Sequence, residues 1–198
     1  MNIIVAYKKD GVVYMGSDTR IDGYDQKFNE LCECNYSIQK LDNGILVGFV
    51  GEKIEVQTLK AYLDDIFTLD GKGELTRKHL VTEIVPALIE MLKSEKLYNK
   101  SDKDNPFMKM NLMVAHKDKL YEICSGFEIY TYEDFQVIGK TVKFVEPVML
   151  NTKPDDDIYA RIVKALDITA QNSATVARPY VLIDTKDLQY KILGDNNL

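Results

Sequence analysis

Two short runs of β-branched and aromatic residues, residues 2–7 and 12–17, stand on either side of an Asp-Gly step at Asp10-Gly11. An Asp-Gly step between two such runs is a strong short-range signal for a β-hairpin. The pattern recurs in residues 36–41 and 45–50, which flank Asp42-Asn43-Gly44, and the second of these runs is almost entirely apolar. A continuous apolar strand needs cover on both faces. The chain is therefore expected to build sheets that are buried between other layers.

The hydrophobic period changes from 2 to 3.6 after Gly51, which predicts helices. One apolar stripe ends before Asp70-Gly71, and a second covers residues 75–97. Pro86 lies inside the second stripe and predicts a kink or an irregular turn, because proline has no backbone N–H. Three consecutive aspartates at 155–157 predict the start of a further helix over 155–171, since acidic residues favour helix N-termini. The first stripe consists of Leu59, Tyr62, Leu63, Ile66 and Phe67.

Strand patterns return in residues 110–115, 119–124, 128–132 and 135–138, and again in 180–185 and 188–193. The chain thus alternates runs of strands with runs of helices. That order favours an α+β fold with antiparallel sheets stacked between helical layers, and it argues against a parallel βαβ fold. We find no composition shift or linker that would divide the chain, so we expect a single domain over residues 1–198.

The charge balance excludes some partners. The net charge of the 198 residues is −6, whereas nucleic acids and anionic membranes attract an excess of Lys and Arg, so neither is expected as a partner. The first residues, MNIIVAY, lack the features of a secretory signal, which predicts a cytoplasmic protein. Cys32 and Cys34 form a C-x-C pair with no second pair downstream, so we expect buried or half-buried thiols and no metal site.

Several strings in the chain resemble the proteasome-β/HslV family of N-terminal-nucleophile hydrolases. The opening hairpin ends in Asp18-Thr19-Arg20, the second hairpin reads SIQKLDNGILVGFVG, and the helix after Gly51 begins G-x-x-x-E-x-Q-T-L. LYEICSG and Ile138-Gly139 also stand where the family places similar strings. The resemblance covers essentially the whole chain, and it implies a four-layer αββα sandwich of two antiparallel sheets between helical layers. It also implies a third helix after Gly139, which would carry Pro147.

The resemblance also assigns the positions of an active site. The family's N-terminal Thr, Ser or Cys attacks the peptide bond, and a Lys and an Asp keep it reactive. The Asp is present as Asp18, but the nucleophile position falls on Asn2, or on Met1 after a slip of one residue. The Lys position falls on Ser37 (or Tyr36), because Lys40 is expected on the opposite face of the strand. A later Asp-x-x-Ser pair falls on Asn172 and Thr175.

We therefore expect no catalytic residue and no cofactor, and interpret these positions as vestiges of an active site. Asp18 is then expected to accept hydrogen bonds from the backbone of the following loop. The family's ring-forming habit implies a homo-oligomeric subunit, with a peptide or protein as an alternative ligand. Two other functions stay open: a hydrolase that uses another nucleophile, and a monomeric binding module. The other candidate nucleophiles are Ser37, Cys34 and Thr19.

Overall fold

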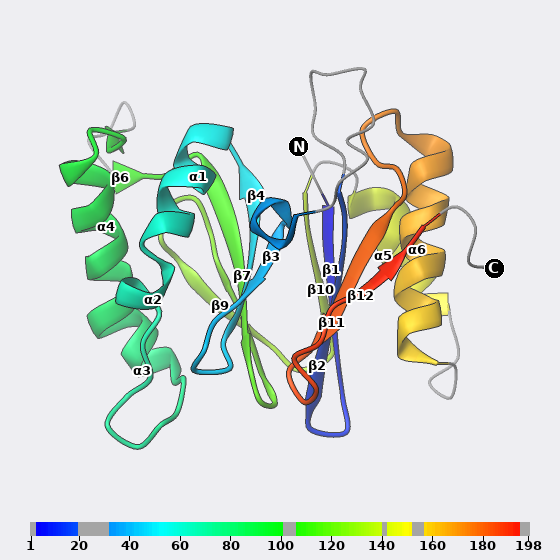
Figure 1. Ribbon diagram of the computed structural model, residues 1–198, viewed down its shortest axis with the longest axis horizontal. Coiled ribbons are helices and arrows are strands. Elements are labelled where there is room, and N and C mark those ends of the chain that lie inside the picture. The colour runs from blue at the N-terminus through cyan, green and yellow to red at the C-terminus, as the bar shows by residue number, and fades with distance from the viewer. Residues whose placement is uncertain (1–2, 20–31, 101–105, 140–141, 152–156, 195–198) are drawn as a thin grey trace.

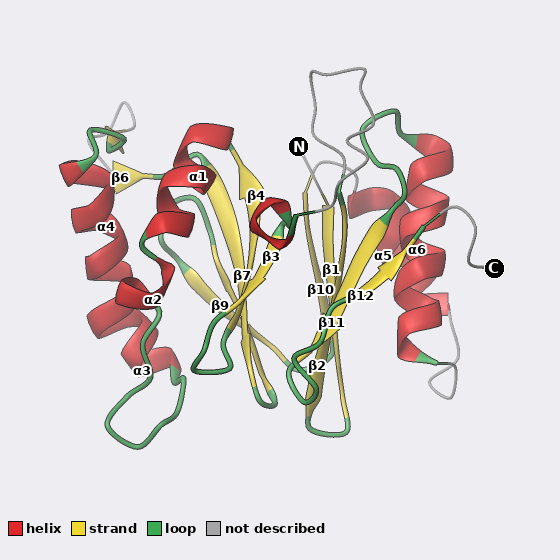
Figure 2. Ribbon diagram, viewed as in Figure 1, coloured by secondary structure: helices red, strands yellow, loops and turns green. Residues whose placement is uncertain are grey.

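Two five-stranded antiparallel sheets face each other between two layers of helices (Figure 1). The computed structural model describes residues 3–19, 32–100, 106–139, 142–151 and 157–194. One helical layer consists of α1 to α4 and covers one sheet, while α5 and α6 cover the other (Figure 2). The α+β class and the four-layer αββα sandwich that the sequence predicts are confirmed.

The first sheet has the strand order β10-β1-β2-β11-β12. Its centre is the predicted opening hairpin, in which β1 pairs with β2 and the turn residues Asp10 and Gly11 have φ values of 50° and 78°. Both values lie in the left-handed region that this hairpin turn requires, which explains the Asp-Gly step. The strands are β1 (Ile3–Lys9), β2 (Val12–Asp18), β10 (Phe135–Gly139), β11 (Tyr180–Asp184) and β12 (Lys191–Leu193).

The second sheet has the order β3-β4-β7-β8-β9. The apolar run after Gly44 forms β4, which is buried on both faces as its composition predicts. A separate two-stranded ribbon joins β5 (Asn99–Lys100) to β6 (Pro106–Phe107). The strands of the main sheet are β3 (Ile38–Lys40), β4 (Leu46–Gly51), β7 (Met110–His116), β8 (Lys119–Ile123) and β9 (Ile129–Tyr132).

The helices of the first layer are interrupted twice, and the sequence predicts only the interruption near Pro86. The first stripe forms α1 (Lys53–Ala61) and α2 (Leu63–Ile66), separated at Tyr62. The second forms α3 (Arg77–His79), a π-helical turn η2 (Leu80–Ile84) and α4 (Val85–Ser94). Pro86 lies at the start of α4, so the missing N–H coincides with the change of helix type.

The second helical layer consists of α5 (Val142–Asn151) and α6 (Ile158–Asn172). The implied third helix is α5, and Pro147 lies inside it. Asp157 caps α6, because its side chain accepts a hydrogen bond of 3.0 Å from the N–H of Tyr159. The cap confirms the predicted role of the acidic run at the one aspartate of the three that the structure describes.

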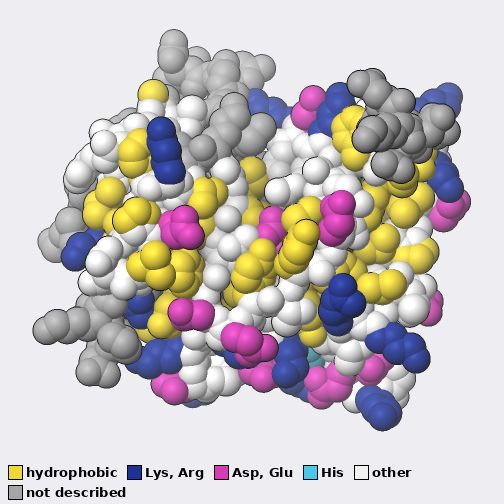
Figure 3. All heavy atoms as spheres, turned by 180° about the vertical axis from the view of Figure 1, so that it is seen from behind, with side chains coloured by type: hydrophobic (Ala, Val, Ile, Leu, Met, Phe, Trp, Pro, Cys, Tyr) yellow, Lys and Arg dark blue, Asp and Glu magenta, His cyan; other side chains and the backbone are white. Residues whose placement is uncertain are grey.

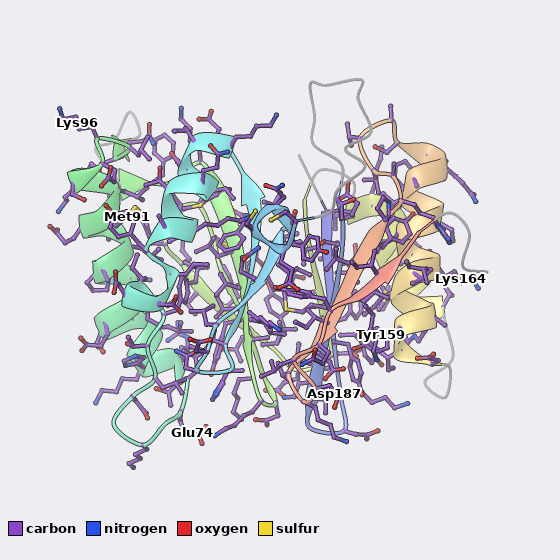
Figure 4. The ribbon with its side chains drawn as sticks, viewed as in Figure 1. Glu74, Met91, Lys96, Tyr159, Lys164 and Asp187 are labelled. Carbon is purple, nitrogen blue, oxygen red and sulfur yellow. The ribbon has the colours of Figure 1, made fainter. Side chains whose placement is uncertain are left out.

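Apolar side chains fill all three spaces between the four layers. Between the sheets, Ile4 and Met15 pack with Ile38 and Leu46. At the end of the sandwich away from the start of β1, the Tyr159 hydroxyl of α6 donates a hydrogen bond to Asp184 of β11. Figure 4 shows Tyr159 and Asp187 toward this end. None of the described helices is long and apolar enough to cross a membrane.

Candidate functional site

The predicted site lies where β1 begins and β2 ends. Asp18 is fully buried, and its Oδ1 accepts a hydrogen bond of 3.0 Å from the backbone N–H of Ile3. The register pairs Ile4 with Ser17, so Ile3 lies opposite Asp18. This donor belongs to the neighbouring strand, whereas the loop that the sequence predicts as the source of donors, from residue 20 on, lies outside the described residues, so that expectation stays a prediction. Met1 and Asn2, the predicted nucleophile positions, lie outside the described residues.

Ser37 immediately precedes β3 and is 6% exposed. Its carbonyl oxygen accepts a hydrogen bond of 2.8 Å from the N–H of Phe49. The next residue, Ile38, packs between the two sheets with Met15 of β2. Lys40 is exposed, and its Nζ donates to the carbonyl oxygen of Leu188 at 3.3 Å. The expectation that Lys40 and Ser37 point to opposite faces, as strand residues three apart do, stays a prediction.

Asn172 and Thr175 lie at the C-terminal end of α6. Asn172 is exposed and donates through Nδ2 to the carbonyl oxygen of Ile168 at 2.8 Å. Thr175 is half-buried, and its N–H donates to the Ser173 hydroxyl at 3.2 Å. Both hydrogen bonds are local to the end of the helix, where they satisfy backbone groups that the helix leaves open.

A carboxylate that the sequence did not reveal lies one turn earlier on α6. Asp167 accepts hydrogen bonds from Arg178, at 2.9 Å from Nε and 2.7 Å from NH2, and from the Tyr180 hydroxyl at 2.9 Å. Burial disfavours the charged carboxylate, but the bonds from Arg178 and Tyr180 outweigh burial and lower the pKa of Asp167. Tyr180 pairs in register with Asp18, so this network supports the strand beside the site.

A small hollow opens at the same end of the sandwich. It has a volume of about 210 Å³ and is bounded on one side by Gly139, which pairs with Ile3. A Cβ at Gly51 would overlap the backbone of Lys109 and Met110, so this wall of the hollow requires glycine. The other lining residues are Val50, Gly51, Lys109, Met110, Asn111 and Ser125.

The C-x-C pair differs from the expectation. Both Cys32 and Cys34 are exposed, because Cys32 precedes and Cys34 lies within a single 3₁₀ turn, η1 (Glu33–Asn35), on the surface before β3. The third cysteine, Cys124, is half-buried. Within the described ranges, no three His, Cys, Asp or Glu side chains gather in a way that could hold a metal ion.

No protein-family model matches the chain, and no curated protein sequence matches it. Solved structures do match. BPH from Thiobacillus denitrificans in complex with epoxomicin superposes with a TM-score of 0.70 at 18% identity, covering 94% of this chain and 99% of that one. Eukaryotic HslV from Trypanosoma brucei superposes with a TM-score of 0.60 at 13% identity, covering 92% and 98%.

The chain has the proteasome-like fold of HslV and Anbu. For Anbu, the structure titled as the helical assembly of the complex from Pseudomonas aeruginosa superposes with a TM-score of 0.66 at 15% identity, covering 100% of this chain and 88% of that one. In this proteasome-like fold the described site supplies a buried carboxylate, a buried serine and a small hollow. The assignment of Asn2, Ser37, Asn172 and Thr175 as vestigial positions stays a prediction.

Proposed function

We propose that the protein is a divergent, single-domain member of the proteasome-β/HslV family that lacks threonine-peptidase activity and acts as an assembling or binding subunit. The hydrogen bond between Ile3 and Asp18 carries this proposal, because it fixes the register of the opening hairpin. Counting back from that register, the family's nucleophile position is Asn2. An asparagine amide has neither the hydroxyl nor the thiol that forms an acyl-enzyme.

The lysine position supports the same conclusion. The resemblance places the family's lysine at Ser37, whose hydroxyl cannot supply the positive charge that keeps an N-terminal nucleophile reactive. Lys40 does not take its place, because Lys40 is exposed and its amine lies 5.3 Å from the centre of the Tyr190 ring. Two matched losses in a retained scaffold favour a binding or assembly role over hydrolysis.

Epoxomicin provides a direct test, since the similar BPH structure holds this compound. We expect no covalent adduct on the intact protein by mass spectrometry, and no cleavage of fluorogenic peptides. Any covalent label on the wild-type chain, at any residue, would refute the absence of peptidase activity. An archaeal or bacterial proteasome treated in parallel serves as the positive control.

Variants that restore the missing side chains test whether Asn2 and Ser37 are the nucleophile and lysine positions. We suggest Asn2→Thr, Ser37→Lys and the double variant, each released from a cleavable fusion so that residue 2 is the first residue. The double variant is expected to react with epoxomicin, while each single variant stays unlabelled, because nucleophile and lysine act together. A folded double variant that stays unlabelled would contradict the assignment of Asn2 and Ser37.

The surface offers a contact for assembly. A groove of about 350 Å³ lies between η2 and α4 of the first helical layer and the edge strand β9. Val81 and Tyr130 border it and are 46% and 53% exposed. Figure 3 also shows hydrophobic side chains across the middle of the face that it displays, with charged ones gathered along the lower edge. The groove is lined by Arg77, Val81, Val85, Phe127, Glu128, Ile129 and Tyr130.

Analytical ultracentrifugation tests this role. We expect a species larger than the 22.6 kDa monomer, and dissociation of that species in the variant Val81→Glu/Tyr130→Glu. The control is Leu150→Glu, which changes an equally apolar side chain that is 67% exposed on α5. A wild-type protein that sediments as a monomer would refute assembly and favour the monomeric binding module.

One observation favours a second function, a hydrolase with a different nucleophile. Thr19 donates its hydroxyl to the carbonyl oxygen of Pro179 at 2.9 Å, and Ser37 is buried, but Cys34 is exposed beside the amine of Lys60. Iodoacetamide modification of Cys34 would abolish activity of such a hydrolase. The same peptide-cleavage assay, with and without this modification, decides between the two functions.

A further inference from the structure

Two exposed thiols, those of Cys32 and Cys34, lie at the turn η1. Cys32 precedes the turn, and its carbonyl oxygen accepts a hydrogen bond of 2.9 Å from the N–H of Asn35. Cys34 lies inside the turn, two residues after Cys32 in the chain. Neither side chain is covered by the described residues, so both sulfur atoms are open to small molecules.

A lysine from the first helical layer lies beside this turn. The Nζ of Lys60 on α1 donates to the carbonyl oxygens of Cys34, at 2.9 Å, and Tyr36, at 2.7 Å. The same amine lies 5.7 Å from the centre of the Phe49 ring. Burial holds the pKa of Lys60 below its usual value, and the two cysteines act in the opposite direction. The structure therefore positions an amine beside Cys34.

The two thiols differ in reactivity. The hydrogen bond from Cys34 lowers the pKa of Cys32, while the same bond raises the pKa of Cys34. Cys32 therefore carries the larger thiolate fraction, and the thiolate is the reactive form. Cys124 is the opposite case, because burial, followed by Glu122, raises its pKa to about 12. Cys124 is expected to stay inert under conditions in which Cys32 reacts.

We propose that Cys32 and Cys34 form a thiol–disulfide exchange site that reacts with low-molecular-weight disulfides such as oxidised glutathione. Ring closure is geometrically accessible. Two residues apart, the Cα atoms are separated by at most about 7 Å even in an extended chain, and a helical turn brings them closer. A disulfide needs a Cα separation of about 4.4–6.8 Å, which such a turn provides.

The reaction proceeds in two exchanges that balance. The Cys32 thiolate attacks one sulfur of the small disulfide, forms a mixed disulfide and releases one small thiolate. The Cys34 thiol then loses its proton to solvent and attacks the Cys32 sulfur, which releases the second small thiolate. The chain ends with a Cys32–Cys34 disulfide, and the small disulfide has been reduced to two thiols.

Lys60 is a positioning residue for the second exchange. Its positive charge lowers the pKa of Cys34, although other groups raise that pKa more. Once Cys32 is in a mixed disulfide, its sulfur no longer attracts the Cys34 proton as strongly as the free thiolate does. The amine then favours the Cys34 thiolate, which resolves the mixed disulfide.

Intact-mass spectrometry after incubation with oxidised glutathione tests the site. The wild-type chain is expected to become about 2 Da lighter without a stable adduct, and peptide mapping should place the disulfide between Cys32 and Cys34. Cys34→Ser should trap a mixed disulfide on Cys32, about 305 Da heavier, whereas Cys124→Ser should behave as wild type. Unmodified wild-type protein, stable wild-type adducts or a disulfide between chains would each overturn the proposal.

The rate at which the mixed disulfide is resolved tests the role of Lys60. Lys60→Met should slow resolution about threefold, so the mixed disulfide accumulates transiently, while Lys60→Arg restores the wild-type course. Lys53→Met, about two turns earlier on the same helix, is the matched control and should leave both steps unchanged. Equal rates of resolution in Lys60→Met and wild type would refute the role of Lys60, while the wild-type mass change still tests the cysteine pair.

Discussion

The Asp167 network allows a quantitative prediction for the strand beside the candidate site. The carboxylate accepts two hydrogen bonds from Arg178 and one from Tyr180, and Asp167→Asn removes the charge while it retains one acceptor oxygen. Hydrogen bonds to charged groups contribute about 1.5–3 kcal/mol each. The Asp167 side chain is 32% exposed, so solvent screens the pair. We therefore expect a loss of about 1–2 kcal/mol in the free energy of unfolding at pH 7.

The pH dependence follows from the lowered pKa of Asp167. A carboxylate with a lowered pKa in the folded state stabilises the protein above the pKa of the unfolded chain, which is about 3.9. That contribution is lost as the pH falls through the lower, folded-state pKa. The difference between wild type and Asp167→Asn should therefore be constant from about pH 5 to pH 8 and should close below about pH 4.

Urea unfolding of both proteins at several pH values measures this difference. At this chain length the loss corresponds to a fall of about 2–8 °C in Tm. Asp64→Asn, which changes an exposed aspartate on α2, is the control and should alter stability by less than about 0.5 kcal/mol. A stability difference for Asp167→Asn that is equal at pH 3 and pH 7 would refute the role of its charge.

Three further predictions concern buried groups. The Ser17 hydroxyl is buried and has no hydrogen-bond partner within the described part of the chain, so Ser17→Ala should be neutral or raise the free energy of urea unfolding by about 1 kcal/mol. Gly16→Ala should lower it by about 1–3 kcal/mol, because the new methyl group would overlap side chains of α6 and β11; an unchanged unfolding midpoint would contradict that packing. Burial raises the pKa of Glu55, so its contribution is present below the unfolded pKa and is lost as the pH rises through the folded pKa. Glu55→Gln should thus be more favourable, relative to wild type, in thermal unfolding at pH 8 than at pH 4, while its side-chain oxygen still accepts from the N–H of Lys109.

Local chemistry explains which elements the sequence predicts. The Asp10-Gly11 step requires positive φ values, so the opening hairpin follows from two residues. Pro86 lacks an N–H, so irregularity in the second helical stripe also follows from one residue, although the π-helical form of η2 does not. Helix α5 contains an internal proline and was expected only through the family resemblance, since packing against α6 and β10 offsets the local cost of Pro147.

The candidate site is harder to predict because its residues meet through long-range pairing. Asp167 and Arg178 are eleven residues apart, but α6 ends at Asn172, so their contact depends on how the chain returns from α6 into β11 beside β2. Likewise, no pattern in the sequence places Lys60 beside Cys34, because α1 and η1 are joined only through the second hairpin. Identities at Asp18 and Ser37 are readable from the sequence, whereas their surroundings are a property of the packed sheets.

The connection between β9 and β10 links the two sheets directly and limits how they can separate. Only Glu133 and Asp134 separate these strands, which are edge strands of different sheets. Lys8 of β1 donates its backbone N–H to the carbonyl oxygen of Asp134 at 2.6 Å, and the Lys8 amine forms an ion pair with Glu133. The two sheets are therefore tied covalently and by hydrogen bonds along this one side. On the other side, β3 and the segment before β12 meet through side-chain hydrogen bonds: the Tyr190 hydroxyl donates to the carbonyl oxygen of Ile38 and accepts from the N–H of Lys40, and the Lys40 Nζ donates to the carbonyl oxygen of Leu188. Spontaneous separation of the layers should thus begin at β3 and β12, where amide hydrogens would exchange with solvent sooner than those of β10.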